Sequence, residues 1–229
     1  MATQAQVLTI VRARLDEADG EHQWLNTELR SWVNEAMRDI ARRTESLMQS
    51  DTVTGVVGQH NYTLDSDIVR VHMVEWRPTA GGVYPMEATP IHVFKSAVPP
   101  QQEDSQGRPQ LWTLWGFGPT MELLVFPTPS EAGTFRVYKY LMPPDLATDG
   151  SDAADTVTVP TGWEDLICDY VEYRAKRKDA DPDWQAAKAL YDEHLLDLHA
   201  TAINWQDQGG VITAGHSSVT AWLWADTGY

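Results

Sequence analysis

The apolar residues of this chain change their spacing twice along the sequence, and this change limits the folds that are possible. Near both ends they recur every three to four residues, which is the period of a helix with one buried face. Between residues 51 and 142 they fall instead in short runs separated by glycine and proline, as in strands. Terminal helices must meet if each is to bury its apolar face. The sequence therefore predicts an α+β fold, in which a four-helix bundle is interrupted by a β insertion.

Residues 1–50 predict the first pair of bundle helices. A first helix over residues 4–18 has a stripe formed by Val7, Leu8, Val11 and Leu15. A second helix, capped by Asn26 or Thr27, has a longer stripe formed by Leu25, Leu29, Trp32, Val33, Ala36, Met37 and Ile40.

Residues 51–156 predict the β insertion and its acidic exit linker. Strands are expected within residues 51–64, 68–77, 110–116, 121–127 and 134–142, with a long loop at 89–108 that has room for one helical turn. Short strands that follow one another without long helices between them favour an antiparallel sandwich or barrel.

Residues 157–205 predict the second pair of bundle helices. Thr161 and Glu164 have the spacing of a capping box, and Asp181 followed by Pro182 predicts another helix start. The expected buried faces are Trp163, Leu166, Ile167, Tyr170, Val171 and Arg174 in one helix and Trp184, Ala187, Leu190, Tyr191, Leu195 and Leu198 in the other.

Residues 206–229 predict an extended C-terminal arm that is poor in charge and rich in aromatic residues. A solvated tail normally has the opposite composition. Two interpretations stay open: the arm packs on its own domain, or it docks into a neighbouring protein as an added strand. We favour docking, with Val219, Trp222, Leu223, Trp224 and Tyr229 as the contact residues.

The charge of the chain argues against tight binding to nucleic acid. Lys and Arg total 17 against 33 Asp and Glu, which gives a net charge of −16, and the excess of acid extends along the whole sequence. Binding to phosphates needs Lys and Arg, whereas DNA that must slide past a surface benefits from repulsion. The apolar runs are also too short to span a membrane, and the N-terminus lacks a secretory pattern.

The chemistry-bearing residues do not form a catalytic or metal-binding pattern. Of the seven histidines, only His194 and His199 share an element, and a spacing of five places them on different helix faces. Cys168 is the only cysteine, which excludes an internal disulfide, and its apolar neighbours predict a buried, inert thiol. We therefore expect no enzyme activity, no cofactor and no metal.

The tryptophans of the β insertion support an alternative function. Trp112 and Trp115 flank a predicted turn, and tryptophans in such positions are typical of carbohydrate-binding surfaces. Glu122 is the nearest carboxylate. A carbohydrate-binding or hydrolytic module is the second hypothesis, although one carboxylate does not make a glycosidase site.

Four segments resemble the head-to-tail adaptor (connector) proteins of tailed bacteriophages. They are LNTELRSWVNEAMRDIARRTE, GQHNYTLDSDIVRVHMVEW, GTFRVYKYLMPPDL and VPTGWEDLICDYVEYRAKRKDADPDWQAAKALYDEHL, and together they extend over about residues 24–198. The resemblance implies a structural virion protein at the head–tail junction, assembled in the host cytoplasm as a ring, typically of twelve subunits.

That ring would join the portal protein to a tail or nozzle protein and let DNA pass without specific binding or any membrane contact. The resemblance also implies that the C-terminal arm docks into the portal. For contacts between subunits we expect the bases Arg38, Arg42 and Arg43 of one copy to meet acids of the next, namely Asp165, Asp169 and Glu172.

Overall fold

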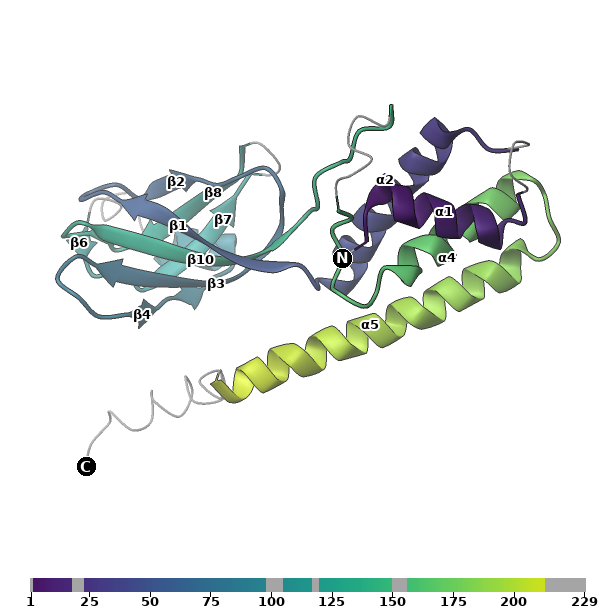
Figure 1. Cartoon of the computed structure of the whole chain (residues 1–229). Coiled ribbons are helices and arrows are strands. Elements are labelled where there is room, and N and C mark those ends of the chain that lie inside the picture. Colours follow the sequence, from purple (N-terminus) through teal and green to yellow (C-terminus); the bar gives the residue numbers. More distant parts are fainter. Residues whose placement is uncertain (1, 18–22, 98–104, 117–119, 150–155, 213–229) are drawn as a thin grey trace. The chain divides into compact units, whose positions relative to one another are not determined.

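The computed structural model describes residues 2–17, 23–97, 105–116, 120–149 and 156–212 (Figure 1). These residues form five helices and ten strands, so the predicted α+β class is confirmed. They divide into a helical unit, built from Met1–Ser46 and Pro143–Tyr229, and a β unit, Leu47–Met142. Each unit has its own hydrophobic core.

Four helices build the helical unit: α1 (Gln4–Arg14), α2 (Asn26–Thr44), α4 (Asp165–Lys178) and α5 (Trp184–Ile212). Helix α4 packs against the other three. The buried side chains come from the inward faces of all four helices and include Val7, Val11, Leu29, Val33, Met37, Ile40, Ile167, Val171, Tyr191, Leu195 and Leu198. The periodicity of the two terminal segments thus identified most of this core.

The chain segment that returns from the β unit is fixed to α2 by a buried asparagine. The side-chain amide of Asn34 donates to the carbonyl of Leu146 at 2.7 Å, and its oxygen accepts from the Leu146 amide at 3.0 Å. Asn34 is 4% exposed, so both bonds lie away from water, where an unpaired amide would be costly. This pair of bonds sets where the second half of the helical unit begins.

The helix starts differ from those predicted. The capping box lies at α1, where the Thr3 hydroxyl accepts from the Gln6 amide at 3.2 Å and the Gln6 side chain accepts from the Thr3 amide at 2.8 Å. Helix α2 begins at Asn26 without a side-chain cap, so the predicted cap at Asn26 or Thr27 is wrong.

The predicted capping box at Thr161 is also wrong. Gly162 has φ +90°, a left-handed conformation that interrupts a helix, and α4 therefore begins only at Asp165. The Glu164 carboxylate accepts from the amide of Gly162 at 2.8 Å instead of closing a capping box.

Helix α5 is longer than predicted, and one apolar residue expected on its buried face is exposed. It continues to Ile212, so the expectation of an extended arm is wrong over residues 206–212. Leu190, assigned to the buried face, is 45% exposed, and Leu25 before α2 is 70% exposed. Both positions are apolar, but each falls just outside the stripe that faces the core.

The β unit is a sandwich of two four-stranded sheets. One sheet has the order β1 (Met48–Gly55), β10 (Gly133–Leu141), β3 (Ile68–Pro78), β4 (Tyr84–Pro85), all antiparallel. The other has β2 (Asn61–Thr63), β8 (Glu122–Phe126), β7 (Leu111–Trp115) and β5 (Glu87–Ala88), where β5 runs parallel to β7. The strand pairings do not close into a barrel among the described residues, which corrects the barrel-like alternative.

Smaller elements complete the β unit. A short helix, α3 (Ile91–Ala97), lies where one helical turn was expected, and β6 (Gln106–Gly107) pairs with β9 (Thr128–Pro129). The core between the two main sheets is formed by Tyr62, Val74, Trp76, Trp112, Leu123, Val125, Phe135 and Val137, with others at its margin.

Candidate functional site: the charged network of the helical unit

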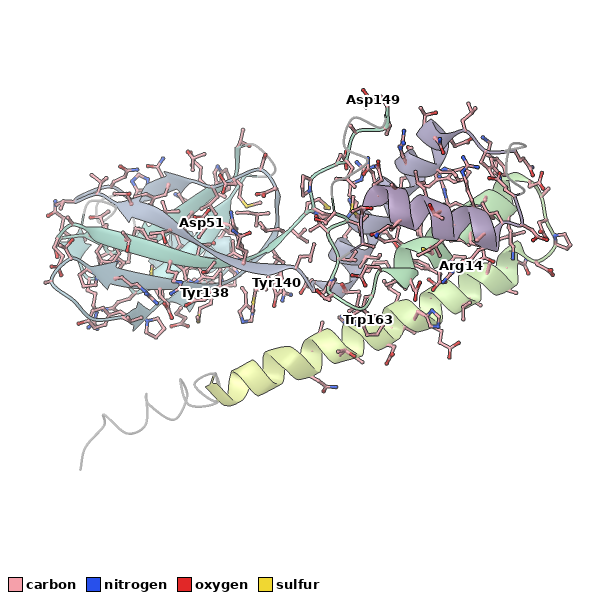
Figure 2. The ribbon with its side chains drawn as sticks, viewed as in Figure 1. Arg14, Asp51, Tyr138, Tyr140, Asp149 and Trp163 are labelled. Carbon is pink, nitrogen blue, oxygen red and sulfur yellow. The ribbon has the colours of Figure 1, made fainter. Side chains whose placement is uncertain are left out.

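Three helices of the helical unit meet at the carboxylate of Asp169. Arg14 of α1 hydrogen-bonds one oxygen of this carboxylate, and Nδ1 of His194 in α5 lies 2.7 Å from the other. The Asp169 side chain on α4 is 3% exposed, so these two partners replace water. Figure 2 places Arg14 at the junction of the helices.

Arg14 lies close to two further acids of α4. Its guanidinium is 3.3 Å from Asp165 and 3.9 Å from Glu172. Burial lowers the pKa of Arg14, but the hydrogen bond and charge of Asp169 outweigh it, and the net effect raises the pKa above the ordinary value. Arg14 and Asp169 therefore form an ion pair that fixes α1 on α4, and the contact of His194 with the same carboxylate adds α5.

A second network joins α2 to α5. The Tyr191 hydroxyl, in a side chain 1% exposed, donates to Asp39 at 2.6 Å, and Arg43 lies 3.1 Å from Asp192 and 3.5 Å from Asp39. Tyr191 also contacts the rings of Tyr170 and Tyr173. Burial, followed by the hydrogen bond to Asp39, raises the pKa of Tyr191, so its hydroxyl stays a proton donor.

The structure places most of the predicted subunit-contact residues in pairs within one chain. Arg38 lies 2.9 Å from Asp145, Arg43 binds α5, and Glu172 accepts from Lys176 at 2.8 Å. Arg42 is exposed and has no ion-pair or hydrogen-bond partner among the described residues. Contacts of these residues between subunits stay a prediction, with Arg42 and the 77% exposed Asp165 as the most accessible members.

Sequence reasoning missed Arg14 and His194, which complete the cluster around Asp169. One signal was available for Arg14: the segment that forms α1 contains two arginines and no acid, so their partners had to come from elsewhere. The predicted docking residues of the arm, Val219, Trp222, Leu223, Trp224 and Tyr229, lie outside the described residues.

The network does not resemble a nucleophilic site. Cys168, next to Asp169, is 1% exposed, and burial raises the pKa of its thiol to about 12, so the prediction of a buried, inert thiol is confirmed. Within the part of the chain that the structure describes, His, Cys, Asp and Glu side chains form no group of three suited to a metal ion. The arrangement can hold helices together.

The tryptophans of the alternative function separate in the structure. Trp112 is 5% exposed and belongs to the core of the sandwich, which corrects its assignment as a surface anchor, whereas Trp115 is 57% exposed. Glu122 lies directly opposite Trp115 on β8. A single exposed ring beside one carboxylate does not form the stacking platform that the carbohydrate hypothesis requires.

A pocket of about 250 Å³ opens in the β unit between the edge strands of the two sheets. Lys139, with a side chain 4% exposed, lies in it 2.7 Å from Asp65 and 3.2 Å from Asp51. Burial by itself lowers the pKa of Lys139, but its two carboxylate partners raise the pKa by more than this. The net pKa lies above the ordinary value, so the ammonium stays charged. Its charge is thus already matched by protein groups, and the pocket is smaller than those that usually hold a ligand.

The described side chains thus form a helix bundle joined by ion networks and a β sandwich with its own core. A family model matches residues 2–214, and the chain belongs to the SU10 adaptor protein family, which consists of structural adaptor proteins of phages. The predicted resemblance to phage adaptors is thereby confirmed. No curated protein matches the chain. None of the helices in the described ranges is long and apolar enough to cross a bilayer.

Proposed function

We propose that this chain is the head-to-tail adaptor of a tailed phage, forming a ring between the portal protein and a tail or nozzle protein. The observation that carries the proposal is the family match over residues 2–214. In this role the ring encloses the channel through which DNA leaves the head. Twelve subunits is the expected number, because that is the usual number in the adaptors that the chain resembles.

The electrostatics of the chain support a channel through which DNA moves without being held. A net charge of −16 repels phosphates. The bases of the helical unit are also largely occupied: Arg14, Arg38, Arg43 and Arg174 each pair with a carboxylate of the same chain. Guanidinium groups already bound to carboxylates are poor ligands for a phosphate backbone.

The C-terminal arm is the proposed contact with the portal. Helix α5 carries the chain as far as Ile212, and the docking residues Trp222, Trp224 and Tyr229 follow. Large aromatic side chains are the usual anchors of stable protein interfaces. A segment with so few charges also loses little free energy of hydration when a partner covers it.

Light scattering on the full chain and on a version ending at Ile212, each mixed with the cognate portal, tests the proposal. The truncation leaves α5 complete, so any loss of binding reflects the arm. We expect the full chain to join the portal as a ring and the shortened chain to fail. A full chain that ignores the portal would refute the adaptor function, whereas a shortened chain that binds equally well would refute the docking arm alone.

A further inference from the structure

Strand β1 forms an open edge of the β sandwich. It is eight residues long and pairs within its sheet with β10 alone. The other edge strands of the two main sheets, β2, β4 and β5, have only two or three residues each. A long edge strand presents backbone groups that pair readily with another extended chain. Among the described strands, β1 therefore offers an added strand the longest stretch of backbone to pair with.

The ladder between β1 and β10 decides which backbone groups of β1 face the open edge. The amide of Leu141 donates to the carbonyl of Leu47 at 3.0 Å, and hydrogen-bonded pairs recur at every second residue of an antiparallel ladder. The odd-numbered residues of β1 therefore bond β10. Thr52 agrees with this assignment, because its N–H donates to the Asp51 carboxylate at 2.7 Å. The N–H and C=O groups directed to the open edge are those of Met48, Ser50, Thr52 and Thr54.

An arginine without a carboxylate partner lies over the same edge. Arg136 reaches from β10 across to β1, where its guanidinium donates to the Ser50 hydroxyl at 3.0 Å and lies 5.2 Å from the centre of the Tyr138 ring. Within the described ranges Arg136 forms no ion pair, whereas Arg77 on the same side of the sheet is bound to Glu75. Neutral neighbours thus hold the guanidinium and leave its charge unmatched, so this side of the edge favours a carboxylate.

The inner side of the same edge has an apolar part. Val53 of β1 lines the pocket described above together with Leu64, Ile68 and Val137. Successive side chains of a strand point to opposite faces of the sheet. A strand added to β1 would place every second side chain over this apolar part and the others on the side of Arg136. A segment in which apolar and acidic residues alternate fits both sides.

The described strands of a second copy do not supply such a segment. Strand β1 has one open edge, so pairing with the β1 of another copy would stop at two chains and could not build a ring. The other edge strands are too short to cover it. In the proposed function the portal is contacted by the C-terminal arm. The remaining partner is the tail or nozzle protein, which needs a surface separate from that arm.

We propose that the β1 edge binds an extended segment of the tail or nozzle protein, which adds to the sheet as a further strand and places a carboxylate on Arg136. The inference rests on the proposed function, because it names the surface that meets one of its partners. Backbone bonds to the even-numbered residues of β1 supply the affinity, and the side chains on the two faces select the sequence. The Asp51 carboxylate releases the N–H of Thr52 when the strand binds.

Thr52→Pro tests the strand addition. Proline removes an N–H that faces the open edge, so the ladder with β10 is kept while an added strand loses a bond and meets the proline ring. We expect the tail or nozzle protein to bind the full chain, assembled on its portal, at least about ten-fold more weakly. Surface plasmon resonance measures the affinity, and thermal unfolding checks the fold. Thr52→Val is the matched control, because it keeps the N–H and the side-chain size and should leave binding unchanged.

Arg136→Gln tests the charge at the edge. We expect this variant to bind the tail or nozzle protein about five-fold more weakly, with a smaller dependence on salt than the wild-type chain. Arg108→Gln is the matched control. Arg108 is also an exposed arginine stacked on a tyrosine, Tyr84, but that tyrosine belongs to β4 at the opposite edge of the sheet. Its replacement should leave binding unchanged.

Amide hydrogen exchange of the full chain gives a readout specific to strand addition. In the absence of the partner, the amides of Gln49, Asp51 and Val53 should exchange slowly, because they bond β10, and those of Ser50 and Thr54 should exchange fast. Binding of the tail or nozzle protein should slow exchange at Ser50 and Thr54. Mass spectrometry with single-residue fragmentation resolves this alternation.

The outcomes distinguish this inference from the proposed function. A Thr52→Pro chain that binds as tightly as the wild-type chain, or fast exchange at Ser50 and Thr54 in the complex, would overturn the strand addition and leave the adaptor function standing. Equal binding by Arg136→Gln would overturn the role of the charge. A wild-type ring on the portal that does not bind the tail or nozzle protein would overturn the tail-side part of the proposed function together with this contact.

Discussion

At the residue scale, Asp169 is the buried charge at which three helices of the bundle meet. Its carboxylate is 3% exposed and joins Arg14 of α1 to His194 of α5 across α4. A buried carboxylate contributes to stability only while its partners are present, since losing one leaves charge that water cannot solvate. Arg14 therefore has a structural role out of proportion to its place on the shortest helix of the bundle.

Replacing Arg14 should destabilise the helical unit. We expect Arg14→Met, which keeps the length of the side chain and removes its charge, to lower the free energy of unfolding by about 3 kcal/mol, because Asp169 is left buried with His194 alone. Urea unfolding followed by circular dichroism measures the change.

The control for this prediction is Arg42→Met. Arg42 is exposed on α2 and lacks a partner among the described residues, so the same substitution there should change the free energy of unfolding by less than about 0.5 kcal/mol. Equal effects of the two variants would show that the Asp169 network contributes nothing specific.

At the element scale, β10 is the strand on which the sandwich depends. It pairs with β1 on one side and with β3 on the other, and it contributes Phe135 and Val137 to the core. Gly133 begins the strand beside the buried ring of Trp76. A Cβ atom at Gly133 would lie 2.6 Å from the Arg77 carbonyl and 2.6 Å from the Trp76 ring, so this position has no room for a side chain.

We expect Gly133→Ala to destabilise the β unit by about 1–3 kcal/mol, because the strand pairing or the Trp76 ring must shift. Gly107→Ala is the matched control, since its Cβ atom would meet Pro127 at 3.4 Å, close to ordinary contact. Thermal unfolding followed by tryptophan fluorescence compares the two variants. A Gly133→Ala chain as stable as the Gly107→Ala chain would contradict this account of β10.

The elements could largely be predicted from the sequence because their signals are local. The 3.6-residue period identified α2 and its buried residues, and β-branched runs identified β3 and β10. The predictions of the helix starts were wrong for local reasons as well. Thr161 and Glu164 have the spacing of a capping box, but the left-handed conformation of Gly162 between them prevents a helix from starting there. The end of α5 predicted from composition was also wrong, because the helix continues through Gly209 and Gly210.

The candidate site could not be predicted in the same way, because it depends on contacts between distant residues. Asp169 was identified as an important acid, but its partners lie 155 and 25 residues away in sequence. Trp112 and Trp115 have similar neighbours in sequence, yet one is 5% and the other 57% exposed. The alternation of a strand places these two rings on opposite faces, but it does not say which face is buried until the facing sheet is known.

At the scale of the whole molecule, the chain combines a rigid helical unit, a β unit with its own core and a C-terminal segment rich in aromatic residues. This division suits an adaptor, because separate surfaces can serve neighbouring subunits, the portal and the tail. The family assignment gives the class of protein.

Electron microscopy of the full chain bound to its cognate portal tests the central claim most directly. The account predicts a second ring on one end of the portal, coaxial with it and enclosing an open channel. Chains scattered singly around the portal, or a portal left bare at a concentration of chain well above that of the portal, would contradict it.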